Sequence, residues 1–359
     1  GILFTPSIPL SMGKVTGSTE NIAEVRNRGI ELTLGWQDNI KDFTYHIGGN
    51  FSYNQNKVMK YKGSLNRYWE YDNAGNPIRF VSNYGDVAQS GFGGVIVENR
   101  MLGEMYLRQL YHGDGSYSGG KPDINAGPKD GMIRTESDMA WVKAMIADGY
   151  KFNGVTKVAK DQLWYGDLIY ADANGDGNYG DTNDMNFTGT STQPRYNFGV
   201  NLSAAYKGFD FYMLWAGSAG FDLYWNHSSY NGTRTENGFG ISQRVADDHY
   251  FYDPENPSDP RTNITAKYPR ITDQTQRDNA ASSVFWKYKG DYVKLKNIQI
   301  GYTIPVKWTR KFMVEKLRFY FSGENLLTIT DYPGLDPEMG TSITYPLTKQ
   351  FAFGAQLSF

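Results

Sequence analysis

The sequence predicts an all-β protein, an antiparallel transmembrane β-barrel, on three observations. Apolar and polar residues alternate over long segments, as expected of membrane strands of about 9–11 residues. Aromatic residues form 15% of the chain and glycines number 40, which suits aromatic girdles and small pore-facing positions. The mean hydropathy is -0.56, which excludes a bundle of membrane helices but suits a barrel, because its inner face and loops meet water.

The alternation recurs along the chain. Successive side chains of a strand point to opposite faces, so alternate apolar residues line one face. The predicted strands, in order, are Ile30–Trp36, Phe43–Tyr53, Arg195–Tyr206, Phe209–Trp215, Tyr292–Ile304, Leu317–Phe321 and Phe351–Phe359. The opposite face carries mainly Gly, Ser, Asn, Thr and Gln. A soluble sandwich also alternates, but its strands usually span about 5–6 residues.

The last strand carries the clearest pattern. Phe351, Phe353, Ala355, Leu357 and Phe359 share one face, and small or polar residues occupy the other. A soluble domain rarely exposes a wholly apolar strand face, whereas the outer face of a membrane barrel meets lipid.

A hairpin loop and a β-bulge define the predicted strand pairing more closely. If Lys207-Gly208 is a two-residue hairpin loop, Tyr206 pairs with Phe209 and the apolar face continues without a slip. The apolar parity changes within Tyr292–Ile304, and a β-bulge near Lys296-Asn297 would restore it.

The connections between strands are of two kinds. Short ones are Gln37–Asp42, Lys207-Gly208 and Pro305–Glu315; long ones are about Asn54–Asn99, Asp172–Pro194, Gly217–Gly290 and Gly323–Gln350. Outer-membrane barrels have short periplasmic turns and long outer loops, so we assign the short connections to the periplasmic side. Trp36, Phe43, Tyr206, Phe209 and Phe359 should then lie at the periplasmic membrane boundary with their rings outward.

The strand number stays open at seven to nine, because Leu102–Tyr170 could hold two more strands or one large excursion. Bacterial single-chain barrels have even strand numbers. The pattern therefore predicts that Gly1–Phe359 is the carboxy-terminal portion of a larger transmembrane barrel domain.

The sequence gives little support for an enzymatic function. The net charge is -2 with no basic stripe, which gives no reason to expect nucleic acid, and the chain has no Cys. The four histidines, His46, His112, His227 and His249, fall in different segments without zinc-site spacing. The glycine cluster at Gly91–Gly94 lacks the Lys of a phosphate loop. We therefore predict no catalytic residues.

A series of motifs then becomes recognisable. They are NIAEVRNRGIEL at Asn21–Leu32, GDLIYADANGDG at Gly166–Gly177, YKGFD at Tyr206–Asp210, DYVKLKN at Asp291–Asn297 with GYTIP at Gly301–Pro305, GENLLTIT at Gly323–Thr330, YPGLDPE at Tyr332–Glu338, and Tyr345-Pro346. In content and order this series resembles the SusC/RagA-like TonB-dependent transporters.

The resemblance implies an about 22-stranded barrel with an amino-terminal plug, located in the outer membrane of a Gram-negative, Bacteroidetes-like bacterium. It implies a SusD-like surface lipoprotein as partner, TonB as the energy source, and oligosaccharides or peptides as imported substrates. The plug and the TonB box are expected outside this chain.

One loop has the pattern of a Ca²⁺ ligand set. Asp172, Asn174 and Asp176 supply oxygens at positions 1, 3 and 5, Gly177 stands at position 6, and Asn178 offers a carbonyl at position 7. Position 12 is Asn183 instead of Glu, and Asp181 or Asp184 could replace it. The alternative is an Asx-rich turn whose side chains cap their own backbone.

Aromatic clusters mark the long loops, and their rings could stack on sugars or anchor a protein interface. Interface and loop-core roles are favoured over direct ligand contact. The residues are Tyr68, Trp69, Tyr71, Tyr224, Trp225, Tyr230, Tyr250 and Tyr252.

Alternative functions remain open at this point. An unpartnered TonB-dependent receptor or porin-like channel would lack the lipoprotein. A secreted calcium-binding β-sandwich adhesin would have water-facing strands. An outer-membrane hydrolase would cluster a Ser, a His and a carboxylate at the barrel rim.

Overall fold

The computed structural model describes residues 2–4, 20–61, 67–72, 74–75, 77–82, 97–225, 240–272, 279–342 and 345–359. The chain divides into two compact units. We call the first, Gly1–Glu24 with Lys60–Gly189 and Tyr224–Lys287, the loop domain. The second, Val25–Met59 with Thr190–Leu223 and Tyr288–Phe359, is the sheet unit.

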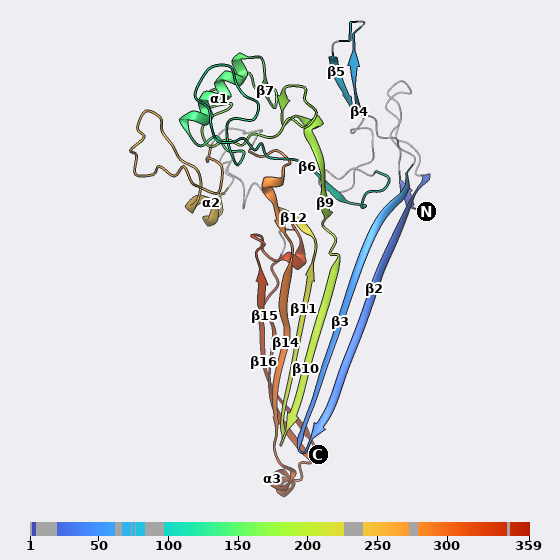
Figure 1. Ribbon diagram of the computed structural model, residues 1–359. Helices are drawn as coiled ribbons and strands as arrows, with labels where there is room; N and C mark the ends of the chain where they lie inside the picture. Colours follow the sequence, from blue (N-terminus) through green and yellow to red (C-terminus); the bar gives the residue numbers. More distant parts are fainter. Residues whose placement is uncertain are drawn as a thin grey trace. The chain divides into compact units, whose positions relative to one another are not determined.

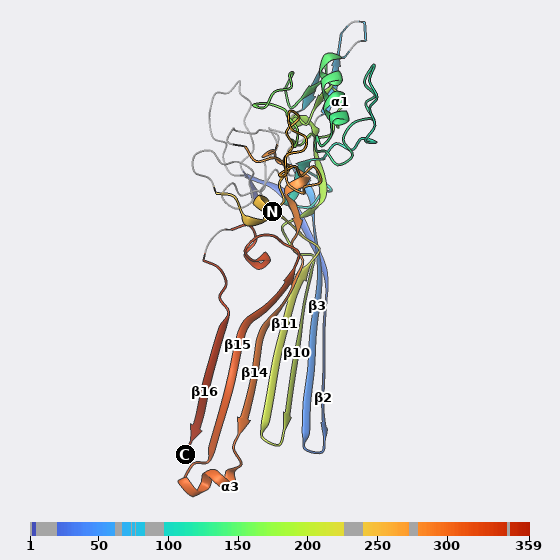
Figure 2. The ribbon, with the colours of Figure 1, turned by 90° about the vertical axis from the view of Figure 1, so that its left-hand side faces the viewer.

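An eight-stranded antiparallel sheet dominates the fold, in the order β1-β2-β3-β10-β11-β14-β15-β16 (Figures 1 and 2). Its strands are β1 (Ile2–Phe4), β2 (Glu20–Ile40), β3 (Phe43–Tyr61), β10 (Tyr196–Tyr206), β11 (Phe209–Ala219), β14 (Tyr292–Thr303), β15 (Lys316–Thr330) and β16 (Gln350–Ser358). The seven predicted strands are all present, and most are longer than the sequence suggested. The eight strands of this sheet fall within the expected seven to nine.

The predicted hairpin turn and the predicted β-bulge are both confirmed. Tyr206 pairs with Phe209 in an unbroken β10–β11 register. The loop residues Lys207 and Gly208 have φ of 46° and 91°, as a type I′ hairpin turn requires. On β14, Asn297 pairs with Leu214 and Leu295 with Trp215, so Lys296 is the bulged residue. The bulge restores the apolar face that the sequence pattern interrupts.

The apolar face of the sheet is exposed. Ile30 is 69%, Leu34 65% and Phe353 82% accessible, values that a sheet packed in a soluble core would not show. All five aromatic residues expected at the periplasmic boundary are likewise exposed. The β2–β3 and β10–β11 turns lie at the same end of the sheet as the carboxy terminus (Figure 2). This is the lipid-facing side of a transmembrane barrel wall.

Polar side chains on the opposite face bond to one another. Ser218 Oγ donates to Asn197 Oδ1 at 2.8 Å, and Arg318 Nε donates to Asp210 Oδ2 at 2.9 Å. His46 pairs with Ser203 on this face, and its Nδ1 lies 3.4 Å from Asn201 Nδ2. This face is therefore the hydrophilic inner side of the wall.

The segment between Leu102 and Tyr170 is one large excursion and adds no strand to the main sheet. The loop domain contains short elements only: β4 (Arg67–Tyr71), β5 (Pro77–Ser82), β6 (Glu104–Arg108), α1 (Glu136–Ala147), β7 (Lys151–Phe152), β8 (Asn178–Tyr179), η3 (Thr182–Asp184), α2 (Gln243–Asp247) and η5 (Val284–Trp286). Near the unit boundaries lie β9 (Met185–Ser191), β12 (Asp222–Tyr224) and β13 (Lys287–Lys289), and the sheet unit adds α3 (Val306–Thr309), η6 (Arg310–Phe312) and η7 (Pro337–Met339).

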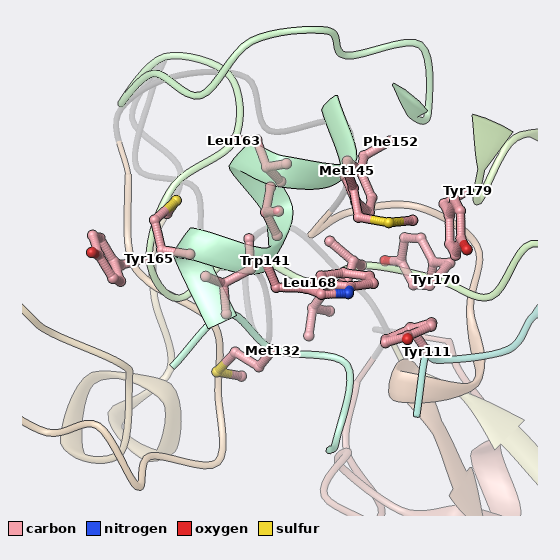
Figure 3. Close-up of a cluster of buried hydrophobic side chains, with 14 of the residues drawn as sticks. Tyr111, Met132, Trp141, Met145, Phe152, Leu163, Tyr165, Leu168, Tyr170 and Tyr179 are labelled. Atoms are coloured by element: carbon pink, nitrogen blue, oxygen red, sulfur yellow. The ribbon is translucent and has the colours of Figure 1, made fainter. Parts of the chain in front are cut away.

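The loop domain has its own hydrophobic core, centred on Trp141 of α1 (Figure 3). Thr135 caps this helix in a capping box with Asp138. The Trp141 ring stacks on Tyr111 at 5.0 Å between centroids, and its Nε1 donates to the Asp123 carbonyl at 2.8 Å. Gly127 has φ of 87°, and a Cβ there would lie 2.5 Å from the Trp141 ring. This core therefore joins Leu102–Tyr170 to described parts of the Asp172–Pro194 and Gly217–Gly290 connections.

No helix within the described ranges is long and apolar enough to span a membrane.

Candidate functional site

A pocket of about 240 Å³ lies on the loop domain. It is formed by Lys160, Trp164, Tyr165, His249, Tyr250, Phe251, Tyr252, Asp253, Pro254, Arg270 and Ile271. Small-molecule pockets usually span about 300–1,000 Å³, so this volume suits one unit of a longer ligand.

A buried ion pair joins the segments that form the pocket. Asp167 is 1% exposed, and its carboxylate accepts from Arg270 Nε at 2.7 Å and Arg270 Nη2 at 2.9 Å. The same carboxylate accepts the Trp164 amide at 2.8 Å and Asn279 Nδ2 at 3.0 Å. The two oxygens of Asp167 thus accept four hydrogen bonds, and the bidentate pair with Arg270 fixes the orientation of both side chains. Asp167 therefore holds the 160–167 segment against the segment that carries Arg270.

Five of the eleven residues that line the pocket are aromatic. The Tyr165 and Tyr252 rings lie 5.1 Å apart, edge to face. Tyr252 Oη donates to Glu136 Oε1 at 2.9 Å. This hydrogen bond, with burial adding to it, raises the pKa of Tyr252, so the phenol stays a neutral donor. Rings fixed in this way offer apolar faces for stacking.

Charged groups surround these rings. Lys160 Nζ lies 5.9 Å from the centre of the Trp164 ring, which is within cation–π range. His249 Nδ1 lies 2.7 Å from the Ala246 carbonyl; this nitrogen carries a proton, because a carbonyl oxygen can only accept. Asp253 adds a carboxylate at the same pocket. The site can bind a group that is partly apolar and partly charged.

The aromatic residues predicted from the loops have different locations. Tyr250 and Tyr252 both border the pocket, although Tyr250 is 1% exposed and donates to the Arg134 carbonyl at 2.7 Å. Tyr224 and Trp225 are buried, and Tyr224 packs in a second core with Trp286, so these two stabilise the fold.

None of the remaining predicted aromatic residues that the structure describes lines the pocket. Trp69 and Tyr71 belong to the β4–β5 hairpin, and the Tyr71 ring is 59% exposed. The Tyr68 side chain and Tyr230 lie outside the described residues. Trp164 and Tyr165 were missed as pocket residues, although they directly precede the recognised Gly166-Asp167 motif.

The predicted calcium loop binds its own backbone. Asp172 Oδ1 accepts the Gly175 amide at 2.7 Å, and Oδ2 accepts the Gly177 amide at 2.9 Å. Asn174 Oδ1 accepts the Asp176 amide at 2.9 Å, and Asp176 Oδ1 accepts the Asn178 amide at 2.8 Å. The Asn174 and Asp176 bonds are Asx turns, and Asp172 closes the loop over a longer span. Asp172 Oδ1 also accepts the Asp176 amide at 3.2 Å, and Asp176 Oδ2 accepts Asn174 Nδ2 at 3.0 Å. Each oxygen can accept two bonds, so Asp172 Oδ1 is fully used, whereas the other oxygens keep an acceptor position.

The two residues suggested as replacements at the end of the loop do different things. Asp184 is buried; its Oδ1 accepts the Ala173 amide and its Oδ2 the Gly180 amide, both at 2.7 Å. Burial raises the pKa of Asp184 to about 6. Asp181 accepts from Asn178 Nδ2 at 3.2 Å and caps η3.

In the described portion of the chain, no group of three or more His, Cys, Asp or Glu side chains is arranged to hold a metal ion. Calcium binding stays a prediction.

Comparison with known proteins shows which proteins the chain is similar to. No family model matches the chain. It is 27% identical to TonB-dependent receptor P3 of Formosa agariphila and 26% identical to TonB-dependent receptor P39 of the same organism. Both alignments cover the whole chain, which spans 31% and 32% of those relatives.

Solved structures show the same fold. The RagAB peptide transporter matches over the whole chain with a TM-score of 0.62 at 18% identity, and the RagAB peptide importer in its open-open state matches with 0.60 at 19%. The chain covers 32% and 31% of those structures. The sheet therefore corresponds to part of a larger barrel.

Proposed function

We propose that this chain, a segment of a SusC/RagA-like TonB-dependent transporter, forms the carboxy-terminal part of the barrel of an outer-membrane importer. One observation carries the proposal: a sheet with an exposed apolar face and a polar inner face occurs in a chain that matches TonB-dependent receptors over its whole length. A protein of this kind moves solutes and has no need of catalytic residues. Uptake would draw energy from TonB through parts of the protein outside this chain.

The partner that we propose is a SusD-like surface lipoprotein. The RagAB structures that share this fold are two-component assemblies by name. The loop domain supports the proposal because it has a core of its own and can present a fixed surface. Exposed rings such as Tyr71 are suitable anchors, since interface energy concentrates in a few aromatic residues.

The imported substrate that we favour is a peptide, with an oligosaccharide as the alternative. The Trp164, Phe251 and Tyr252 rings could stack on either ligand. The ammonium of Lys160 and the carboxylate of Asp253 favour a peptide, whose side chains and termini carry charge. The printed function of the RagAB neighbours, peptide transport, agrees.

The test uses the full-length protein purified from its host in a mild detergent and analysed by native mass spectrometry. We expect a complex with one lipoprotein and copurified peptides. A ladder of hexose masses would make the oligosaccharide the substrate. A protein that purifies alone and empty would favour an unpartnered receptor or porin-like channel.

The pocket is tested in the same preparation with Trp164→Ala. Loss of the stacking surface should weaken ligand binding about fivefold, since stacking of this kind contributes roughly 1 kcal/mol. Ile124→Ala is the matched control, because Ile124 is an exposed apolar residue of the loop domain outside the pocket. Equal ligand occupancy in both variants would show that the ligand does not bind in this pocket.

A further inference from the structure

The connection between β14 and β15 differs from the other turns at its end of the sheet. It contains α3 and η6 and leaves large apolar side chains exposed: Trp308 is 58%, Phe312 76% and Met313 84% accessible. In Figure 2, α3 lies beyond the strand ends, at the same end as the β2–β3 turn. Exposed rings at this level continue the lipid-facing belt of the strands.

The same connection is strongly basic. Residues 305–316 include Lys307, Arg310, Lys311 and Lys316, with Glu315 as the single acidic residue. Within the described residues, neither Arg310 nor Lys311 forms an ion pair, whereas Lys207 of the β10–β11 turn lies 4.0 Å from the carboxylate of Asp42. Lys307 Nζ lies 5.9 Å from the centre of the Trp308 ring. The connection thus presents uncompensated positive charge beside apolar rings.

A hollow of about 290 Å³ opens on the lipid-facing side of the same strands. Its lining includes Phe209, Ile300, Tyr302, Phe319, Phe321 and Phe353. Tyr302 pairs with Phe319 one residue before β14 ends, so the hollow begins where the basic connection leaves the sheet. It extends along the strands through Ile300, which pairs with Phe321.

We propose that the hollow and the basic connection together form a binding site for one anionic phospholipid of the periplasmic leaflet. An acyl chain lies along Ile300, Phe321 and Phe353, away from the strand ends. The headgroup phosphate meets Lys307, Arg310 and Lys311, while Trp308 and Phe312 enter the interfacial layer. Aromatic rings and basic side chains are the residues that favour this layer.

The experiment uses full-length protein that has been delipidated in detergent and titrated with dioleoylphosphatidylglycerol or dioleoylphosphatidylcholine. The two lipids share acyl chains and differ in headgroup charge. Native mass spectrometry counts the lipids retained. We expect one phosphatidylglycerol molecule to be retained in preference to phosphatidylcholine.

Three variants separate the two parts of the site. The triple variant Lys307→Gln, Arg310→Gln, Lys311→Gln should weaken phosphatidylglycerol binding by about tenfold or more, because each basic group near an anionic surface contributes. Ile300→Trp should fill the hollow and weaken binding of both lipids. Lys207→Gln, in the paired turn, should change neither. Resistance to unfolding by SDS without heating confirms that each variant is folded.

Equal retention of the two lipids by the wild-type protein and by all variants would mean non-specific annular lipid and would overturn the proposal. Sensitivity to the triple variant with no effect of Ile300→Trp would also overturn it, because no acyl chain would then occupy the hollow.

Discussion

Asp167 has the most consequential single contact in the loop domain. Its carboxylate is bonded to Arg270, Asn279 and the Trp164 amide, and it is almost fully buried. Asp167 belongs to the Gly166–Gly177 motif, and the sequence alone assigns no role to it. Its role depends on residues more than 100 positions away, and one sequence gives no signal for such a pairing.

Removing the Asp167 charge should open the pocket. Asp167→Asn leaves the buried Arg270 without its counter-charge, which typically costs about 3–5 kcal/mol. Hydrogen exchange of the 160–170 segment in the full-length protein measures the free energy of local opening. The matched control is Asp130→Asn: its pair with Arg134 is half exposed on the Asp130 side, and its loss should cost less than about 1 kcal/mol. Equal effects of the two substitutions would contradict this account.

The calcium prediction is also tested at single residues. Millimolar Ca²⁺ should protect the 172–184 segment from proteolysis in the full-length protein, and Asp176→Ala should abolish that protection. Asp161→Ala, an exposed carboxylate outside the loop, should retain it. If the wild-type loop is cleaved equally with and without Ca²⁺, the loop does not bind Ca²⁺. These side chains then serve only to hydrogen-bond their own backbone.

At the level of elements, strand patterns were readable because one face meets lipid and the other water, which imposes a period of two on each strand. The Lys296 bulge was predictable for the same reason. The apolar residues change parity within this strand, and a β-bulge is the usual way to keep them on one face. The helix α1 and the Trp141 core were not predicted. Their hydrophobic residues are irregularly spaced and pack against distant segments, including Leu163 and Tyr250, so they leave no simple period in the sequence.

The β10–β11 turn offers a test of element geometry. Lys207 has φ of 46°, a conformation that β-branched residues strongly disfavour. Lys207→Val should therefore lower the stability of the barrel by about 1–2 kcal/mol. Lys207→Asn should be neutral or slightly stabilising, since Asn-Gly is the preferred type I′ pair. Urea unfolding in lipid vesicles gives both values, and a Val variant as stable as the Asn variant would argue against this turn.

At the level of the whole molecule, the described residues comprise a barrel wall and a loop domain that has a hydrophobic core of its own. The lipid-facing side follows from residues such as Phe353, and the loop domain contains the pocket around Trp164. The wall was predictable from the sequence because lipid contact is local to each strand. The pocket was not, because it needs Lys160–Tyr165, His249–Pro254 and Arg270 together.

The central claim is that β10 and its neighbours line a membrane barrel with lipid outside and water inside. Spin labels on single cysteines at Val200, Asn201, Leu202 and Ser203 test it most directly in full-length protein reconstituted into vesicles. The account predicts that labels at Val200 and Leu202 collide with oxygen, whereas labels at Asn201 and Ser203 collide with a water-soluble nickel complex. Equal exposure of all four labels to the nickel complex would contradict it and favour a water-facing sheet.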